Sequence, residues 1–549
     1  MTNKTDVTKA AIPGVVALQE DGRIADWQRL RYGMFIHWGL YSEIGGVWNG
    51  EPVTKGYNEQ IQMWANISEE DYLDVASKFT ADQFDAAEIC KLAKDAGMKY
   101  IVITTKHHDG FSMFHTATTA YNIVEKTPYG KDPLQLLAEE CRNHGLKFGI
   151  YFSLVDWHQG HEFDHNNCNP IPESMEPVIE QQLRELLTNY GPIAEVWFDM
   201  SAPTMKQSQK IAGLVRELQP EAMINSRIWN NNSDFRTLGD NEIPSVPLEG
   251  AWQTPASIYH STWGYRSWQE REDLEGKTKE LVQSLVSIFA RGGNYLLNIG
   301  PRGDGSIVAF EADVLRGIGS WIQRHASFAG DLSATYFDQH TWGEVLADEG
   351  NLYLCVNNWP EDGKLVLSGL ANKVTKVVED GETTVLSYTT EGDQLIIELP
   401  KQAKDEILPV IRVSIEGALR VIPKNTVSEI DGVWKVDGTY LYTGNGYADE
   451  GHYFTLKQTQ VRLTSYLAVK ESGNISIHLN VEADPNRKYK VAVGNQGQVL
   501  LGAELSTVEI GPFAVPANQI IPLTITLADS AYVGDDLRID FSAATVTRK

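Results

Sequence analysis

Short apolar runs alternate with amphipathic segments through the first 330 residues of the chain. Apolar and aromatic side chains fill residues 32–39, 100–105, 148–154, 194–200, 222–227 and 295–301, and such runs are typical of buried strands in a parallel sheet. Helical periodicity separates them at residues 81–97, 133–144, 174–190, 207–218, 277–290 and 311–325. The alternation predicts an α/β fold, with a (β/α)₈-like barrel favoured over an open sheet. Residues 230–269 contain no clean strand pattern, so we expect the barrel to be irregular there.

The helical period disappears after residue 334. Short β patterns separated by Gly and Asp follow, for example at residues 351–356 and 394–399, and they predict a β-sandwich. We therefore predict three domains: a barrel at 1–334, a β-sandwich at 335–420 and a second β-rich domain at 421–549. We expect the tyrosines of the last domain to pack in its core rather than to bind ligands; they are Tyr440, Tyr442, Tyr447 and Tyr453.

Charge and composition exclude several partners. Lys and Arg number 47 against 73 Asp and Glu, a formal charge of −26, which argues against nucleic acid or an anionic membrane as a partner. The four cysteines predict neither a disulfide framework nor a structural zinc site. The first residues contain no apolar signal segment and no later run could span a bilayer, so we expect a cytoplasmic protein. Whether it forms a homo-oligomer is open from the sequence.

Polar and aromatic side chains recur where the predicted barrel strands end. They are His37 and Trp38, His107-His108-Asp109, Asp156-Trp157-His158, Trp197 with Asp199, and Arg227. Because the carboxyl ends of barrel strands meet at one face, we expect these side chains to converge there. Local sequence alone leaves a second interpretation of Asp199 open, since Asp before Ser201-Ala202-Pro203 also suits the start of a helix.

Two kinds of chemistry fit this set of residues. The histidines could bind a metal ion and activate water, and His161-Glu162-Phe163-Asp164-His165 matches the His-Glu-x-x-His pattern of zinc proteases. Gly160 before it and residues 166–170 after it favour a loop rather than the helix that such a site requires. The favoured alternative is glycoside hydrolysis, in which a pair of carboxylates flanks the bond while His and Trp hold the sugar. The 14 tryptophans and 22 tyrosines suit a carbohydrate site.

Six motifs together resemble the α-L-fucosidases, family 29 of the glycoside hydrolases. They are Phe35-Ile36-His37-Trp38-Gly39, Thr105-Lys106-His107-His108-Asp109-Gly110-Phe111, Gly149 to Leu154 with Asp156-Trp157-His158, Trp197-Phe198-Asp199, Trp263-Gly264-Tyr265 and Leu296 to Pro301. The resemblance implies a (β/α)₈-like barrel followed by a β-sandwich and no metal or other cofactor. It also implies a retaining, exo-acting enzyme that releases terminal α-linked L-fucose from fucosylated oligosaccharides or glycoconjugates through a covalent fucosyl-enzyme.

The resemblance assigns roles residue by residue. Asp199 would be the nucleophile, and a neighbouring Arg would keep it ionised by lowering its pKa. The residues that would line the fucose pocket are His37, Trp48, Glu59, His107, His108, Tyr151, Trp197 and Arg227. A non-catalytic lectin on the same platform stays an alternative, as does the metal-dependent hydrolase.

The general acid/base is not given by the motif. Many members carry a Trp-Glu pair where this chain has Trp252-Gln253, and an amide cannot protonate a leaving group. Asp234, Asp240, Glu242 and Glu249 lie in the same region. We predict Asp240, because Gly239 permits a tight turn that can aim it inward. Glu249 is the second choice, because its apolar neighbours would raise its pKa.

Overall fold

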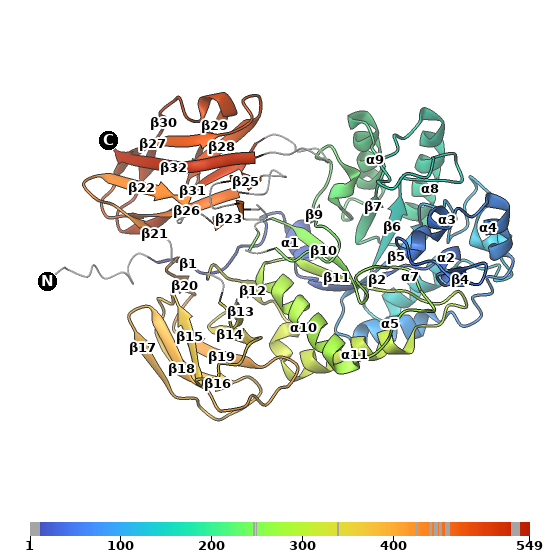
Figure 1. Ribbon diagram of the computed structural model, residues 1–549, viewed down its shortest axis with the longest axis horizontal. Helices are drawn as coiled ribbons and strands as arrows, with labels where there is room; N and C mark the ends of the chain where they lie inside the picture. The colour runs from blue at the N-terminus through green and yellow to red at the C-terminus, as the bar shows by residue number, and fades with distance from the viewer. Residues whose placement is uncertain are drawn as a thin grey trace.

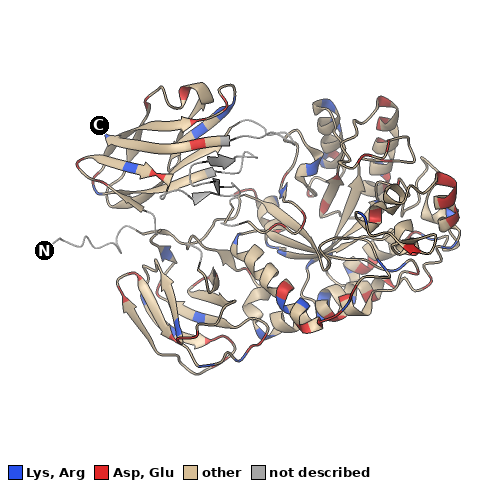
Figure 2. Cartoon of the chain, viewed as in Figure 1, with Lys and Arg blue, Asp and Glu red and all other residues tan. Residues whose placement is uncertain are grey.

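The computed structural model describes residues 11–244, 247–248, 250–337, 340–423, 426–438, 442–443, 448–449, 453–455, 462–528 and 538–549. A parallel barrel is followed by two antiparallel β-domains, and both β-domains lie on the same side of the barrel (Figure 1). The described part of the chain contains no helix that is both long and apolar enough to span a membrane. Acidic and basic residues occur in all three parts (Figure 2).

Eight parallel strands form the barrel, in the order β8-β7-β6-β5-β2-β11-β10-β9. Their bounds are β2 (Tyr32–Ile36), β5 (Tyr100–Lys106), β6 (Lys147–Ser153), β7 (Glu195–Asp199), β8 (Met223–Ile224), β9 (Arg236–Thr237), β10 (Trp252–Ser257) and β11 (Asn294–Ile299). A parallel bridge between Asn225 and Phe235 joins the two ends of this order and closes the barrel. The predicted fold class is confirmed.

Amphipathic helices cover the outside of the barrel, and their starts are set by local sequence. The main ones are α5 (Ala86–Asp95), α7 (Pro133–Asn143), α8 (Glu176–Asn189), α9 (Met205–Leu218), α10 (Leu274–Ala290) and α11 (Ala309–Arg324). Asp85 and Asp132 accept hydrogen bonds from the first backbone N–H groups of α5 and α7, and Thr204 with Gln207 forms a capping box at α9. The six helices agree with the predicted ones to within a few residues.

Two barrel strands, β9 and β10, lie in residues 230–269, where the sequence shows no clean strand pattern and an irregular barrel is expected. Strand β9 has two residues, too few for a periodic signal, and β10 reads Trp-Gln-Thr-Pro-Ala-Ser. All six residues of β10 are buried, including Gln253 and Thr254, so burial here does not follow hydrophobicity. The predicted strand at 222–227 is also shorter, since β8 ends at Ile224 and Ser226–Ile228 form a 3₁₀ turn.

The β-domains each have a hydrophobic core of their own. The first packs a sheet of β12 (Ser333–Ala334), β13 (Gly343–Asp348), β14 (Asn351–Val356), β19 (Val410–Ile415) and β16 (Val374–Glu379) with a sheet of β15 (Lys364–Ser368), β18 (Gln394–Glu398) and β17 (Tyr388–Glu391). The second has two sheets. One contains β21 (Thr426–Ser428), β26 (Arg462–Val469), β31 (Gln519–Leu527), β28 (Lys488–Val493), β29 (Gln496–Leu501) and β23 (Tyr442–Thr443). The other contains β24 (Ala448–Asp449), β25 (Tyr453–Thr455), β32 (Arg538–Arg548), β27 (Gly473–Glu482), β30 (Ile510–Val515) and β22 (Val433–Asp437).

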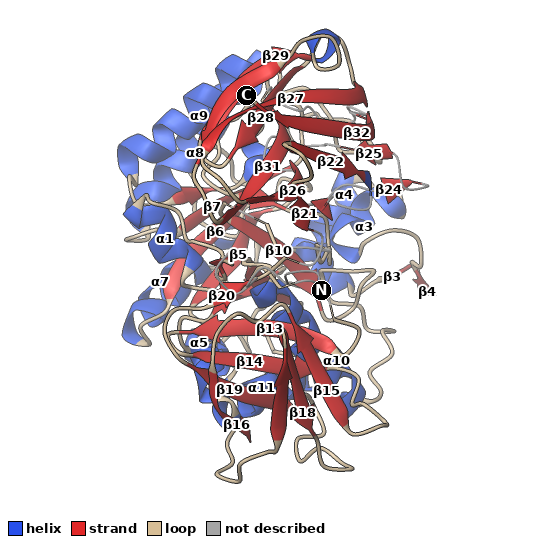
Figure 3. Ribbon diagram, turned by 90° about the vertical axis from the view of Figure 1, so that its left-hand side faces the viewer, coloured by secondary structure: helices blue, strands red, loops and turns tan. Residues whose placement is uncertain are grey.

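Figure 3 shows these sheets as two strand-rich regions beside the helix-covered barrel. Tyr442 and Tyr453 lie in β23 and β25, whereas Tyr440 and Tyr447 lie outside the described residues. The domain boundaries stay predictions. The N-terminal segment crosses the predicted division between the barrel and the first β-domain, because β1 (Ile12–Pro13) pairs with β20 (Arg420–Val421) at the end of that β-domain.

Two buried features link the elements around the barrel. Cys90 of α5 and Cys141 of α7 lie 3.8 Å apart at their sulfur atoms as free thiols, a proximity that their sequence spacing does not reveal.

His325, just after α11, lies between Asp380 and Asp405 of the first β-domain, with Nδ1 2.9 Å and Nε2 3.3 Å from the carboxylates. These contacts connect the barrel to the first β-domain.

Candidate active site

The predicted nucleophile, Asp199, ends strand β7 and is buried, and both of its carboxylate oxygens have partners. Oδ1 accepts a hydrogen bond from Arg227 Nη1 at 2.6 Å, and Oδ2 accepts one from the Tyr151 hydroxyl at 2.7 Å. Burial alone would raise the pKa of Asp199, but the Arg227 guanidinium and the Tyr151 hydroxyl help to hold it below its ordinary value. The carboxylate is therefore ionised and oriented, as a nucleophile requires.

The backbone just after Asp199 is strained. Met200 and Ser201 have φ values of 55° and 67°, a left-handed conformation that costs non-glycine residues about 1 kcal/mol or more each. The turn is held by hydrogen bonds, since Ser201 N donates to Asn167 O at 2.7 Å. On the strand side, the Asn225 side chain bonds both the N–H and the C=O of Phe198, at 2.8 and 2.9 Å. Together these contacts fix the position from which Asp199 projects.

Arg227 lies between Asp199 and the predicted acid/base, Asp240. Its Nη1 binds Asp199, and its Nη2 lies 3.3 Å from Asp240 Oδ1. The Tyr57 hydroxyl approaches the other oxygen of Asp240 at 3.5 Å. The Arg227 guanidinium thus contacts both carboxylates. Their environments differ, because the side chain of Asp240 is 29% exposed and that of Asp199 is 10% exposed.

The turn that carries Asp240 is tight, but its left-handed residue is Asn241 and not Gly239, from which the sequence predicted the turn. Asn241 has a φ of 58°, its N–H donates to Pro255 O at 2.9 Å, and its side chain accepts from Ser257 N at 2.9 Å. Glu242 accepts from Gly239 N at 2.8 Å, which closes the turn.

Two of the other carboxylates considered for this role, Asp234 and Glu242, have structural partners. Asp234 accepts hydrogen bonds from Arg23 and from the N–H of Ile224 in strand β8, each at 2.9 Å, so its carboxylate has a structural role. Glu242 is used in the turn. Glu249, the second choice, lies outside the described residues.

Three buried histidines lie on the same face as Asp199. His37 Nδ1 is 2.7 Å from Asn298 Oδ1, and His108 Nδ1 is 2.6 Å from Ser153 Oγ. Burial lowers the pKa of His37 and of His108 to about 4 and lowers that of His107 well below its ordinary value. All three are neutral at pH 7. The Nδ1 atoms of His37 and His108 are already bound to Asn298 and Ser153, so these two rings keep Nε2 for a hydroxyl group of a ligand.

Trp197 forms an aromatic floor beneath these groups. It precedes Asp199 by two residues and shares its face of β7. Its ring stacks on that of Tyr151 at 5.6 Å, and Arg227 Cζ lies 4.7 Å from its centroid. Tyr151 in turn stacks on His107 at 5.3 Å with an interplanar angle of 5°. The sequence-predicted residues His37, His107, His108, Tyr151, Trp197, Asp199 and Arg227 are therefore brought together.

Glu59 and Trp48 stand apart from this group. Buried Glu59 accepts hydrogen bonds from the N–H groups of Trp263 and Gly264 at 3.1 and 2.9 Å, and burial raises its pKa to about 7. The Trp263 ring lies 5.2 Å from that of His37, and the place of Glu59 in the pocket stays a prediction. Trp48 lies in the hairpin of β3 (Val47–Trp48) and β4 (Glu51–Pro52) and packs on the main core. Its place in the pocket stays a prediction.

Within the part of the chain that the structure describes, one group of residues could hold a metal ion. Ligand atoms of His107, His108 and Asp199 lie within 4.8 Å of one another. The Asp199 carboxylate is already paired with the Arg227 guanidinium, whose positive charge would repel a cation bound there. The His-Glu-x-x-His segment is a loop, as predicted, and His161 uses both ring nitrogens structurally, with Asp156 N and Pro170 O at 3.1 Å each.

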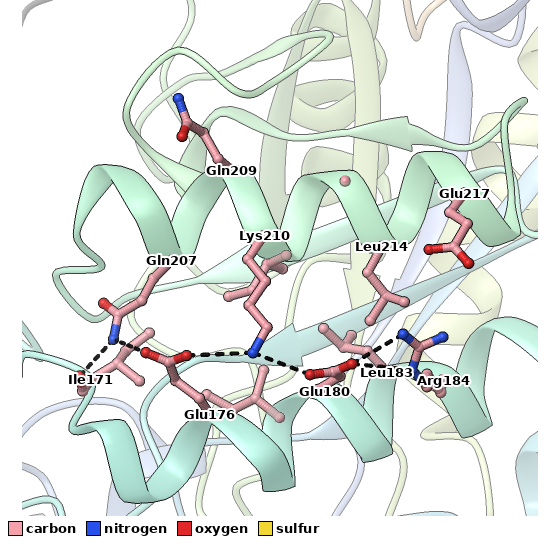
Figure 4. Close-up of a pocket in the computed structure, with 13 residues that line it drawn as sticks. Ile171, Glu176, Glu180, Leu183, Arg184, Gln207, Gln209, Lys210, Leu214 and Glu217 are labelled. Atoms are coloured by element: carbon pink, nitrogen blue, oxygen red, sulfur yellow. Dashed lines mark hydrogen bonds and ion pairs between the residues drawn. The ribbon is translucent and has the colours of Figure 1, made fainter.

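A cleft of about 370 Å³ lies elsewhere, between α8 and α9 on the outside of the barrel (Figure 4). Leu183 and Leu214 face each other across it, and Lys210 bridges Glu176 and Glu180 along its edge. None of the strand-end residues lines it.

Comparisons with known proteins agree with this geometry. The family model for α-L-fucosidase matches residues 13–327. Human tissue α-L-fucosidase is 29% identical over 399 residues, which cover 68% of this chain and 84% of the human protein. An α-L-fucosidase from Lactobacillus casei is 36% identical with a TM-score of 0.51, covering 55% of this chain and 99% of its own. A family 29 α-L-fucosidase from Bacteroides thetaiotaomicron, described as a trapped covalent intermediate with 2-fluoro-fucosyl fluoride, is 25% identical with a TM-score of 0.66, covering 74% and 99%.

Proposed function

The chain belongs to the α-L-fucosidase family of glycoside hydrolases, and on that premise we propose that Asp199 and Asp240 are the catalytic pair of a retaining exo-fucosidase. Asp199 attacks C1 of a terminal α-L-fucosyl residue and forms a covalent ester, while Asp240 gives its proton to the departing glycosidic oxygen. Asp240 then takes a proton from water, whose oxygen attacks C1, and Asp199 leaves as the carboxylate. Two displacements retain the anomeric configuration.

The observation that carries this proposal is the position of Arg227 between the two carboxylates. The guanidinium and the Tyr151 hydroxyl keep Asp199 ionised although it is buried. Asp240, which is more exposed, can exchange protons with solvent and reach the leaving group at the mouth of the barrel.

The remaining residues hold the sugar. His37, His107 and His108 are neutral and bind fucose hydroxyls, while Trp197 packs against an apolar face of the ring. The substrates are fucosylated oligosaccharides or glycoconjugates. Loops at 41–66, 158–172 and 230–269 surround the leaving-group side and set linkage preference, which a panel of fucosides that differ in linkage measures. Light scattering of the purified chain decides between a monomer and a homo-oligomer.

The test compares Asp199→Ala and Asp240→Ala on an aryl fucoside with and without azide. We expect Asp199→Ala to lose about 10³-fold or more in kcat and azide to yield β-fucosyl azide, because azide replaces the nucleophile. We expect Asp240→Ala to accumulate fucosyl-enzyme and azide to yield α-fucosyl azide. Glu242→Gln, from the same turn, is the matched control, because the amide oxygen can still accept from Gly239 N; it should give no azide product. An Asp240→Ala enzyme with wild-type activity on fucosylated oligosaccharides would refute the acid/base assignment, and Glu249→Ala would be examined next.

A further inference from the structure

We propose that Glu195 and Gln253 are positioning residues that hold the Trp197 indole in place from inside the barrel. The inference rests on the proposed function, because it takes Trp197 as the floor of the sugar site and the support of Arg227.

Both residues lie in the barrel interior and are fully buried. Glu195, Trp197 and Asp199 alternate along β7, so their side chains share the face that points inward. Gln253 reaches them from β10: its Oε1 accepts from Trp197 Nε1 at 2.9 Å, and its Nε2 lies 3.1 and 3.3 Å from the two oxygens of Glu195. Among the residues that the structure describes, the buried indole N–H has one partner, the Gln253 carbonyl oxygen.

The Glu195 carboxylate decides which way the Gln253 amide faces. Both Glu195 oxygens accept hydrogen bonds here and the Trp197 indole N–H can only donate, so the amide turns its NH₂ toward Glu195 and its oxygen toward Trp197. Trp27 Nε1 donates to Glu195 Oε2 at 2.6 Å, and Gln253 Nε2 also lies 3.0 Å from the Tyr100 hydroxyl. The N–H groups of Trp27, Trp197 and Gln253 then have acceptors, which stabilises a buried polar network.

Packing does not explain a carboxylate at this position. Among the described residues no cation is paired with Glu195, and burial raises its pKa to about 7 although the Trp27 and Gln253 hydrogen bonds oppose this. The neighbouring strand makes room for it with Gly149, where a Cβ atom would come within 3.0 Å of Glu195 Cγ. An apolar residue would fill this space at lower cost in folding free energy.

Two contacts connect the Trp197 ring to the residues that orient the proposed nucleophile. Its ring stacks on Tyr151, which donates to Asp199, and it lies under Arg227, which joins Asp199 and Asp240. A rotation of the indole would therefore disturb both groups that orient the nucleophile.

The deciding experiment exchanges the two polar groups. In Glu195→Gln, the new amide accepts from Trp27 with its oxygen and turns its NH₂ toward that of Gln253. Relief of this conflict requires Gln253 to flip, which points its NH₂ at the Trp197 N–H. We expect kcat/KM to fall about 10- to 100-fold with a raised KM, from the loss of a buried hydrogen bond and its replacement by two opposed donors.

The double variant Glu195→Gln/Gln253→Glu restores the pattern. The amide introduced at position 195 donates to the carboxylate introduced at position 253, which also accepts from Trp197 and from the Tyr100 hydroxyl. We expect its KM and kcat to return to within about threefold of the wild-type values. A loss caused only by a weakened fold would lower the active fraction, leave KM unchanged and not be rescued by the exchange.

Glu311→Gln is the matched control. Glu311 is also buried, its pKa is also raised to about 7, and it accepts from the Gly300 backbone N–H at 3.0 Å, but it lies on α11 outside the barrel. This variant should keep the wild-type KM. The positioning role is refuted if Glu195→Gln keeps wild-type KM and kcat, or if a folded double variant is no better than the single one. Activity retained in Asp199→Ala would instead refute the proposed function.

Discussion

Arg227→Gln is expected to separate the charge of Arg227 from its packing. The glutamine keeps a polar side chain at this position but removes the positive charge of the guanidinium, whose Nη1 lies 2.6 Å from Asp199 Oδ1. Removal of one partner from a buried ion pair costs about 3–5 kcal/mol, because the other charge stays buried. Asp199 is the group left behind, so we expect kcat/KM to fall by about two to three orders of magnitude at pH 7.

The pH profile of kcat/KM shows in which direction the loss of Arg227 shifts the pKa of Asp199. Burial alone raises the pKa of Asp199, and Arg227 is the largest influence that lowers it. Without Arg227 the carboxyl should protonate at higher pH, so the acidic limb of the kcat/KM profile should move upward. The assay is hydrolysis of an aryl fucoside from pH 4 to 9. Arg23→Gln is the matched control, because it breaks a 2.9 Å ion pair with Asp234 at the other end of the barrel strands. An Arg227→Gln enzyme with an unmoved acidic limb and activity within a few-fold of the wild type would refute the reasoning.

Three further predictions concern stability and metals. Asp380 and Asp405 raise the pKa of His325, so its stabilising charge is fully present below the unfolded pKa of about 6.5 and is lost as pH rises through the higher folded pKa. His325→Asn should therefore lower the free energy of unfolding by about 2 kcal/mol at pH 6 and by less at pH 9. An equal loss at both pH values would contradict this. Gly33→Ala places a Cβ 2.4 Å from the Tyr100 ring and should destabilise the barrel by about 1–3 kcal/mol in urea unfolding, whereas Gly213→Ala, with open space around it on α9, should not destabilise it. Prolonged dialysis against a chelator should leave kcat unchanged, and activity that is lost and then restored by a divalent metal would favour a role of His107, His108 and Asp199 as ligands.

The sequence could predict what depends on local pattern. Helices α5, α7 and α9 begin where Asp or Thr caps them, and strands such as β7 are apolar runs that only a buried sheet accommodates. The same runs place Asp199 at a strand end, and the rule that barrel strands end at one face was enough to group it with His37, His107, His108, Trp197 and Arg227. That part of the candidate site was predicted because it follows from strand direction alone.

The tertiary structure decided what depends on strands meeting across the barrel. Gln253 is a polar residue in a segment without strand periodicity, and only the closure of the barrel brings it to Glu195 and Trp197, 58 and 56 residues away. Likewise, no spacing in the chain reveals that one guanidinium reaches both Asp199 and Asp240. Hydrophobic pattern determines which face of a strand is buried, but the partners of a buried polar group are set by hydrogen bonds between strands, and these exist only once the barrel has closed.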